Sequence, residues 1–61
     1  MNNTRNETIR MTPEEFADRW LVVDWMAAKV ELAKQENTLL EVELERTFRG
    51  RYVRSLSVVL N

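Results

Sequence analysis

Between Pro13 and Gly50 the chain contains neither glycine nor proline, the two residues that most readily interrupt regular structure. A strong helix start precedes this run, because Thr12 offers a hydroxyl N-cap and Pro13 occupies the first helical position. Glu15 follows Thr12 at capping-box spacing. Gly50 is a natural helix stop. These signals predict a mainly α chain with helix over about residues 13–49.

A seven-residue apolar repeat within this run favours one long helix. Its alternating a and d positions are Val23, Met26, Val30, Ala33, Asn37, Leu40 and Leu44. Residues 35–40 resemble the leucine-zipper coiled coils, because a polar a residue, Asn37, precedes a d-position leucine, Leu40, by three residues. The resemblance implies a coiled-coil homodimer. It does not extend to DNA recognition, because basic-zipper proteins carry their basic region before the zipper, and here the arginines follow it.

A helical hairpin is the alternative to the single rod. Thr38 and Glu41 have capping-box spacing, so a second helix could begin after a break near residues 36–38. Two such hairpins would form a four-helix homodimer. The absence of glycine or proline at the break favours the rod.

The segments on either side of the helical region differ from it in character. Residues 1–11 are expected to be a flexible or extended arm, with Thr8–Met11 as a short extended piece. Residues 12–50 form the helical oligomerisation region. Residues 51–61 are basic and apolar, and 51–60 are rich in β-branched and aromatic side chains, which predicts a strand. Such a strand must pair with 8–11, with another copy of itself, or with a partner's sheet edge.

The small size of the chain argues for association. Sixty-one residues form one domain at most, and a core of this size contributes only about 3–5 kcal/mol. The sequence has no cysteine for a disulfide and no histidine for a transition-metal site. We therefore predict a coiled-coil or bundle homodimer. Its core residues would be Val23, Val30, Asn37, Leu40 and Leu44.

Two tryptophans lie in the most apolar part of the predicted helix. Apolar side chains between Phe16 and Ala33 would surround most of its circumference, which is typical of a helix inside an assembly. They could form a homo-oligomer core. They could also dock on a different protein, with Trp20, Trp25 and Met26 as anchors, because tryptophan is enriched among binding hot spots.

Charge is divided unevenly along the chain. All ten acids precede position 46, so residues 1–45 carry a net charge of −5, whereas four arginines give residues 46–61 a net charge of +4. Arg46 and Arg49 would suit the end of a helix. Arg49, Arg51 and Arg54 would steer and orient an acidic partner. Alternatively, the segment 46–54, whose arginines are interleaved with Phe48 and Tyr52, would bind nucleic acid, with the arginines on phosphates and the aromatic rings stacked on unpaired bases. The glutamates at 36, 41, 43 and 45 are expected to form a solvated helix face.

No enzyme motif is present, and no cofactor or metal is implied. The longest apolar stretch is too short and too charged to cross a bilayer, and without a signal peptide the expected compartment is the cytoplasm. We predict a small non-enzymatic homo-oligomeric protein that binds a larger protein as a regulator, inhibitor or adaptor. The alternatives are a nucleic-acid-binding accessory protein that uses the arginines of 46–54, and a purely structural assembly protein.

Overall fold

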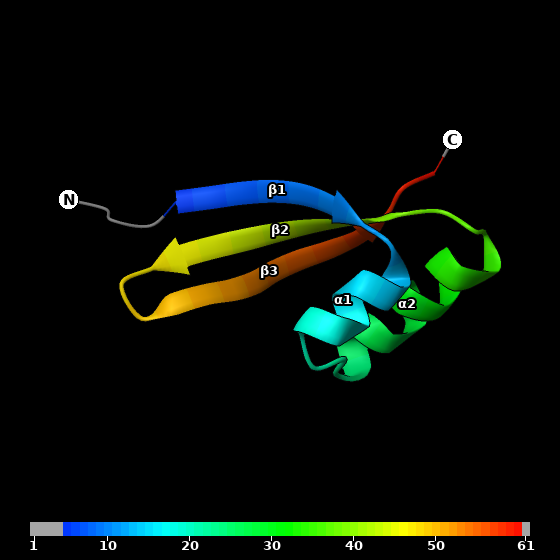
Figure 1. Cartoon of the computed structure of the whole chain (residues 1–61), viewed down its shortest axis with the longest axis horizontal. Helices are drawn as coiled ribbons and strands as arrows, with labels where there is room; N and C mark the ends of the chain where they lie inside the picture. The colour runs from blue at the N-terminus through cyan, green and yellow to red at the C-terminus, as the bar shows by residue number, and fades with distance from the viewer. Residues whose placement is uncertain (1–4, 61) are drawn as a thin grey trace.

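Three strands and two short helices make up the computed structural model, which describes residues 5–60. The elements follow the order β1 (Arg5–Met11), α1 (Pro13–Arg19), α2 (Asp24–Gln35), β2 (Leu40–Thr47) and β3 (Gly50–Val58). The strands form one antiparallel sheet in the order β1-β2-β3. The helices lie together beside one end of the sheet, and the β2–β3 turn projects away from them at the other end (Figure 1).

This small α/β fold shows that the predicted mainly α architecture is wrong. Neither a single helix over 13–49 nor a helical hairpin broken at 36–38 forms, and the coiled-coil or bundle homodimer is excluded with them. The largest error concerns residues 40–47, which form the central strand. Leu40, Val42 and Leu44 are fully buried and alternate with half-buried glutamates, as expected for a strand with one covered face. The four-residue spacing of Leu40 and Leu44 fits a strand as well as a heptad, because four is a multiple of the strand period.

The predicted start of the first helix is confirmed. The Glu15 amide donates to Thr12 Oγ1 at 3.1 Å, and the Thr12 amide donates to Glu15 Oε1 at 3.2 Å, which completes a capping box. The helix nevertheless ends at Arg19, because Trp20 has extended backbone angles (φ −132°, ψ 151°). The chain stays non-helical as far as Val23, and α2 begins at Asp24. A helix break therefore occurs here without glycine or proline.

The second helix ends in a Schellman motif centred on Asn37. Asn37 has a positive φ of 51°, its amide donates to the Lys34 carbonyl at 3.2 Å, and the Thr38 amide donates to the Ala33 carbonyl at 3.0 Å. Asparagine tolerates this left-handed conformation better than most residues. The predicted break at 36–38 thus lies where a helix does end, but a strand follows it instead of a second helix.

The C-terminal segment is a strand, as predicted, but it pairs with a segment that had been expected to be helical. β3 lies against β2, with Leu56 opposite Val42 and Val58 opposite Leu40. The short extended piece predicted at 8–11 is the second half of β1, which pairs with the other side of β2. Gly50 does not stop a helix. It follows the two-residue β2–β3 turn with φ at 134°. Residues 1–4 and 61 of the predicted arm and strand lie outside the described residues.

One face of the sheet and the inner sides of both helices enclose a single core. Its buried residues are Met11, Phe16, Met26, Val30, Ala33, Leu40, Val42, Leu44 and Leu56. Trp20 is half-buried and packs on Phe16, with ring centroids 5.4 Å apart. Across the edge of the sheet, Lys29 Nζ donates to the Leu56 carbonyl of β3 at 2.6 Å. The chain therefore buries an apolar core without a second subunit.

Candidate functional site

The outer side of α2 carries apolar side chains that the core does not use. Met26, Val30 and Ala33 face the sheet and are buried. Trp25 and Leu32 lie on another side of the helix and are 47% and 41% exposed, with exposed Ala28 between them at helical spacing. We call Trp25, Ala28 and Leu32 the α2 stripe. The preceding loop adds Leu21, which is 83% exposed.

The three predicted protein-binding anchors have different surroundings. Met26 belongs to the core, and Trp20 is half-buried against it. Neither side chain is available for a large contact with another protein. Trp25 is the anchor that remains exposed, because α2 turns its Met26 side toward the sheet.

The five residues predicted to form the oligomer core also lie in different surroundings. Val30, Leu40 and Leu44 are buried within the single chain. Val23 is the N-cap of α2 and is partly exposed, and Asn37 is the exposed residue that ends that helix. These five residues therefore do not form one surface.

The sheet face opposite the helices is polar, and the β2 glutamates on it have partners from the neighbouring strands. Arg10 Nη2 lies 3.1 Å from Glu41 Oε2. Ser55 Oγ donates to Glu43 Oε1 at 3.0 Å. Arg54 Nη1 lies 3.7 Å from Glu45 Oε1, so the positive charge of Arg54 is already balanced. Three of the glutamates predicted for a helix face, Glu41, Glu43 and Glu45, thus belong to cross-strand pairs, each of which stabilises a sheet by roughly 0.2–1 kcal/mol. The fourth, Glu36, is the exposed C-cap of α2.

The β2–β3 turn combines cations with an exposed aromatic ring. Arg46 at the end of β2 lies opposite Arg51 near the start of β3. Phe48 and Arg49 form the turn between them, and Phe48 is 91% exposed. The guanidinium carbon of Arg49 lies 5.6 Å from the centroid of the Phe48 ring. We call Arg46, Phe48, Arg49 and Arg51 the hairpin tip.

Tyr52 belongs to the hairpin but not to the same face as Arg46 and Arg51. It lies opposite Glu45, on the face that also carries the Glu45–Arg54 pair. It is 49% exposed. Of the basic and aromatic residues predicted to bind a partner, Arg49 and Arg51 thus lie in the tip, and Tyr52 and Arg54 lie on the glutamate-bearing face.

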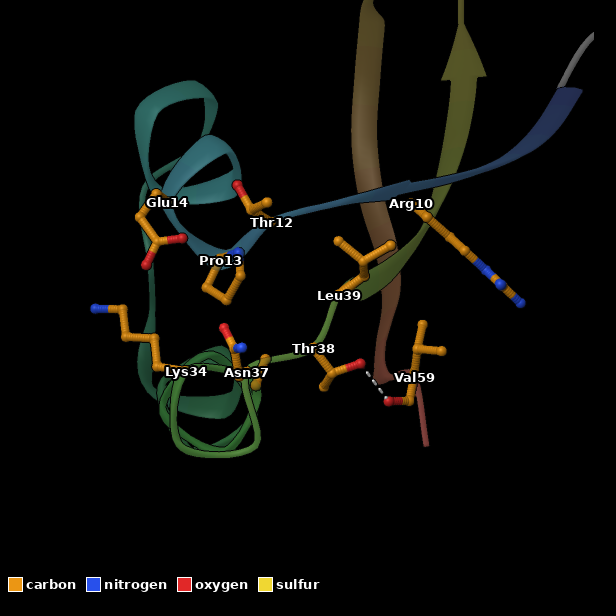
Figure 2. Close-up of a pocket in the computed structure, with 10 residues that line it drawn as sticks. Arg10, Thr12, Pro13, Glu14, Lys34, Asn37, Thr38, Leu39 and Val59 are labelled. Carbon is orange, nitrogen blue, oxygen red and sulfur yellow. Dashed lines mark hydrogen bonds between the residues drawn. The ribbon is translucent and has the colours of Figure 1, made fainter. Parts of the chain in front are cut away.

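An open cavity of about 510 Å³ lies where α1 begins, α2 ends and the segment after β3 passes. In Figure 2 the Asn37 side chain extends into the space facing Pro13, and Lys34 and Glu14 lie at its rim. Much of the polar lining already has a structural function. Thr38 Oγ1 donates to the Val59 carbonyl at 2.8 Å, Lys34 pairs with Glu31, and Arg10 pairs with Glu41. The cavity therefore presents few polar groups that a ligand could bind.

Neither metal ligation nor membrane insertion is supported within the part of the chain that the structure describes. Over residues 5–60, no three acidic, histidine or cysteine side chains converge to hold a metal ion. No helix in the same range has the length and apolar character needed to cross a membrane. Within residues 5–60, the α2 stripe and the hairpin tip each present side chains that the fold leaves exposed.

No protein-family model, no curated protein and no solved structure matches this chain at a significant level.

Sequence reasoning grouped Phe48 with the arginines of 46–54 but missed its position in a hairpin turn, because it placed this residue in the last turn of a helix. The missed signal was Thr47-Phe48-Arg49-Gly50 between two segments of strand-like composition. A short glycine-containing connection of this kind is typical of a β-hairpin. In this turn, the Phe48 side chain extends into solvent.

Proposed function

We propose that this chain is a small non-enzymatic protein that binds another protein through the α2 stripe, as a regulator, inhibitor or adaptor. The observation that carries the proposal is the exposure of Trp25 beside Ala28 and Leu32. The buried side of the same helix already packs against the sheet. Single exposed apolar residues are common, but a row on one helix side is typical of an interaction surface. The expected compartment for this binding is the cytoplasm.

The core does not account for these side chains. Met26, Val30 and Ala33 already fill the space between α2 and the sheet. Replacing Trp25 should therefore cost less than about 1 kcal/mol of folding free energy, as for most substitutions away from a core. A buried tryptophan at a protein interface commonly contributes 2 kcal/mol or more, which corresponds to about 30-fold in affinity. The contrast between these two magnitudes separates a binding residue from a structural one.

The test is affinity capture with the tagged full chain and its Trp25→Ala variant, using extract from the native cells at moderate salt. We expect the natural sequence to retain a specific protein and Trp25→Ala to lose it. Tyr52→Ala is the matched control, because Tyr52 is equally exposed but lies on the sheet. The proposal fails if no protein is retained, or if Trp25→Ala retains the same protein as the natural sequence.

Fluorescence then locates the contact. In a Trp20→Phe variant, Trp25 is the only tryptophan, and its half-exposed ring should shift its emission to shorter wavelength when the captured protein covers it. A second copy of the chain is the competing occupant of the stripe. Solution mass distinguishes the two: a dimer that Trp25→Glu converts to a monomer would assign the stripe to self-association and contradict a separate partner.

A further inference from the structure

The hairpin tip carries positive charge that no ion pair within residues 5–60 neutralises. Arg46 and Arg51 lie directly opposite each other on adjacent strands, an arrangement that brings their Cβ atoms to roughly 4.5–5.5 Å and is destabilising for like charges. Among residues 5–60, ion pairs form at Arg10, Lys34 and Arg54, but none forms at Arg46, Arg49 or Arg51. An anion held between the two strands would remove this repulsion.

The nearest acids do not serve as that anion. Glu45 precedes Arg46 but lies on the opposite face, where it pairs with Arg54. Glu7 of β1 lies opposite Leu44, diagonal to Arg46, and it is not within ion-pair distance of that arginine. Within residues 5–60, the charges of Arg46, Arg49 and Arg51 are therefore available to an anion from outside.

Phe48 adds a second kind of contact beside these cations. Its side chain is 91% exposed, so it contributes almost nothing to the core. Arg49 lies over the ring at cation–π distance, 5.6 Å from the centroid. Thr47 Oγ1 accepts a hydrogen bond from the Arg49 amide at 3.2 Å. This bond helps to fix the turn that carries Phe48 and Arg49. The tip thus offers guanidinium groups and an aromatic face together.

We infer that the hairpin tip binds single-stranded nucleic acid. The guanidinium groups of Arg46, Arg49 and Arg51 contact phosphates, and Phe48 stacks on an unpaired base. A duplex would leave the ring without a base to stack on, and an acidic protein segment would use the charges but not the ring. The tip lies at the end of the sheet that is remote from the helices, so a nucleic-acid strand can reach it without approaching the acidic residues of the helices (Figure 1).

The charge of the chain predicts weak and salt-dependent binding. The overall net charge is −1, so attraction is confined to the tip. Three arginine–phosphate contacts on a single strand give a salt slope of about −2, which corresponds to about a 20-fold loss of affinity between 50 and 200 mM salt. This inference does not depend on the α2 stripe, because the tip lies on a different part of the fold.

The test is fluorescence anisotropy with a labelled oligo-dT of about twenty nucleotides, long enough for a short binding site. We expect the natural sequence to bind at low salt and Arg51→Glu to lose binding. We also expect Phe48→Ala to weaken binding about fivefold or more, because one base–aromatic stack is lost. Tyr52→Ala is the matched control, since it removes an exposed ring from the other face of the same hairpin, and Trp25→Ala should bind as the natural sequence does.

Arg51→Glu also separates binding from folding. Glutamate opposite Arg46 replaces a repulsive cross-strand pair with an attractive one, so the melting temperature should stay the same or rise. If Arg51→Glu unfolds, Phe48→Ala and Arg51→Gln still decide the question. The inference is overturned if oligo-dT is not bound at low salt, if Arg51 and Phe48 variants bind as the natural sequence does, or if a duplex or a poly-glutamate chain binds more tightly than oligo-dT.

Discussion

Two residues reverse the direction of this chain by adopting positive φ angles. Gly50 does so after the β2–β3 turn, at φ 134°, where glycine alone avoids backbone strain. Asn37 does so at the end of α2, and within residues 5–60 it is the one non-glycine residue with positive φ. The Schellman hydrogen bonds to Ala33 and Lys34 depend on this conformation. Residue 37 therefore sets the direction in which β2 leaves the helix.

Replacing Asn37 with alanine should destabilise the protein, and replacing it with glycine should not. Alanine in the left-handed region carries strain, so we expect Asn37→Ala to lower the free energy of unfolding by about 1 kcal/mol. Asn37→Gly should remain within about 0.5 kcal/mol of the natural sequence, because glycine adopts this conformation freely. Urea unfolding of both variants measures the difference. Equal effects of the two substitutions would show that the backbone angle at residue 37 is not the cause.

At the scale of elements, β2 organises the molecule because both other strands pair with it. Its sequence, Leu40 to Thr47, alternates apolar and acidic residues and so contains the strand period. The predicted heptad repeat used only Leu40 and Leu44 of this segment, and their four-residue spacing suits a helix as well as a strand. The capping signals at Thr12 were sufficient because they act through neighbouring residues. Strand pairing was not predictable in the same way, because it joins residues far apart in sequence.

Lys29 protects the outer edge of β3, and its removal should promote association. Its ammonium group donates to the Leu56 carbonyl at 2.6 Å on a strand that has no neighbour on that side within the described sheet. Exposed edges pair readily with other chains, and lysine is a common means of preventing this. We expect Lys29→Met to associate at lower protein concentration than the natural sequence, as measured by light scattering.

Lys34→Met is the matched control, because it also removes a positive charge from α2. Lys34 pairs with Glu31 of the same helix and does not contact a strand. It should remain as soluble as the natural sequence. If both variants associate equally, the lost charge is responsible and the contact with Leu56 is not.

The whole molecule depends on a small core made by one chain. Within residues 5–60, nine buried residues form this core, and each helix and each strand contributes at least one of them. The sequence identified Trp25 and the arginines as candidates for binding, but which side chains face solvent depends on where the sheet lies against α2. That arrangement follows from pairing between β1, β2 and β3. The buried position of Met26 could therefore not be predicted from local sequence patterns, whereas the turn that exposes Phe48 had a local signal in Thr47-Phe48-Arg49-Gly50.

Truncating one core residue should unfold a large fraction of the protein. Leu56 is fully buried, and Leu→Ala at such sites costs about 2–5 kcal/mol. The total stability expected for a core of this size is about 3–5 kcal/mol. We expect Leu56→Ala to lose most of its circular dichroism signal at room temperature. Leu60→Ala, which alters an exposed leucine four residues further on, should retain the signal, and similar spectra for the two variants would contradict the proposed packing.

The order of the strands also has a consequence for how quickly the fold forms. β2 and β3 are joined by a two-residue turn, whereas β1 reaches β2 only after both helices have been crossed. Short connections close faster than long ones, and their entropic cost is lower. We expect the hairpin to form first and β1 to arrive last. During that interval β2 exposes an unpaired edge on each newly made chain, so the rate at which the helical connection closes sets how long each chain can mispair with its neighbours.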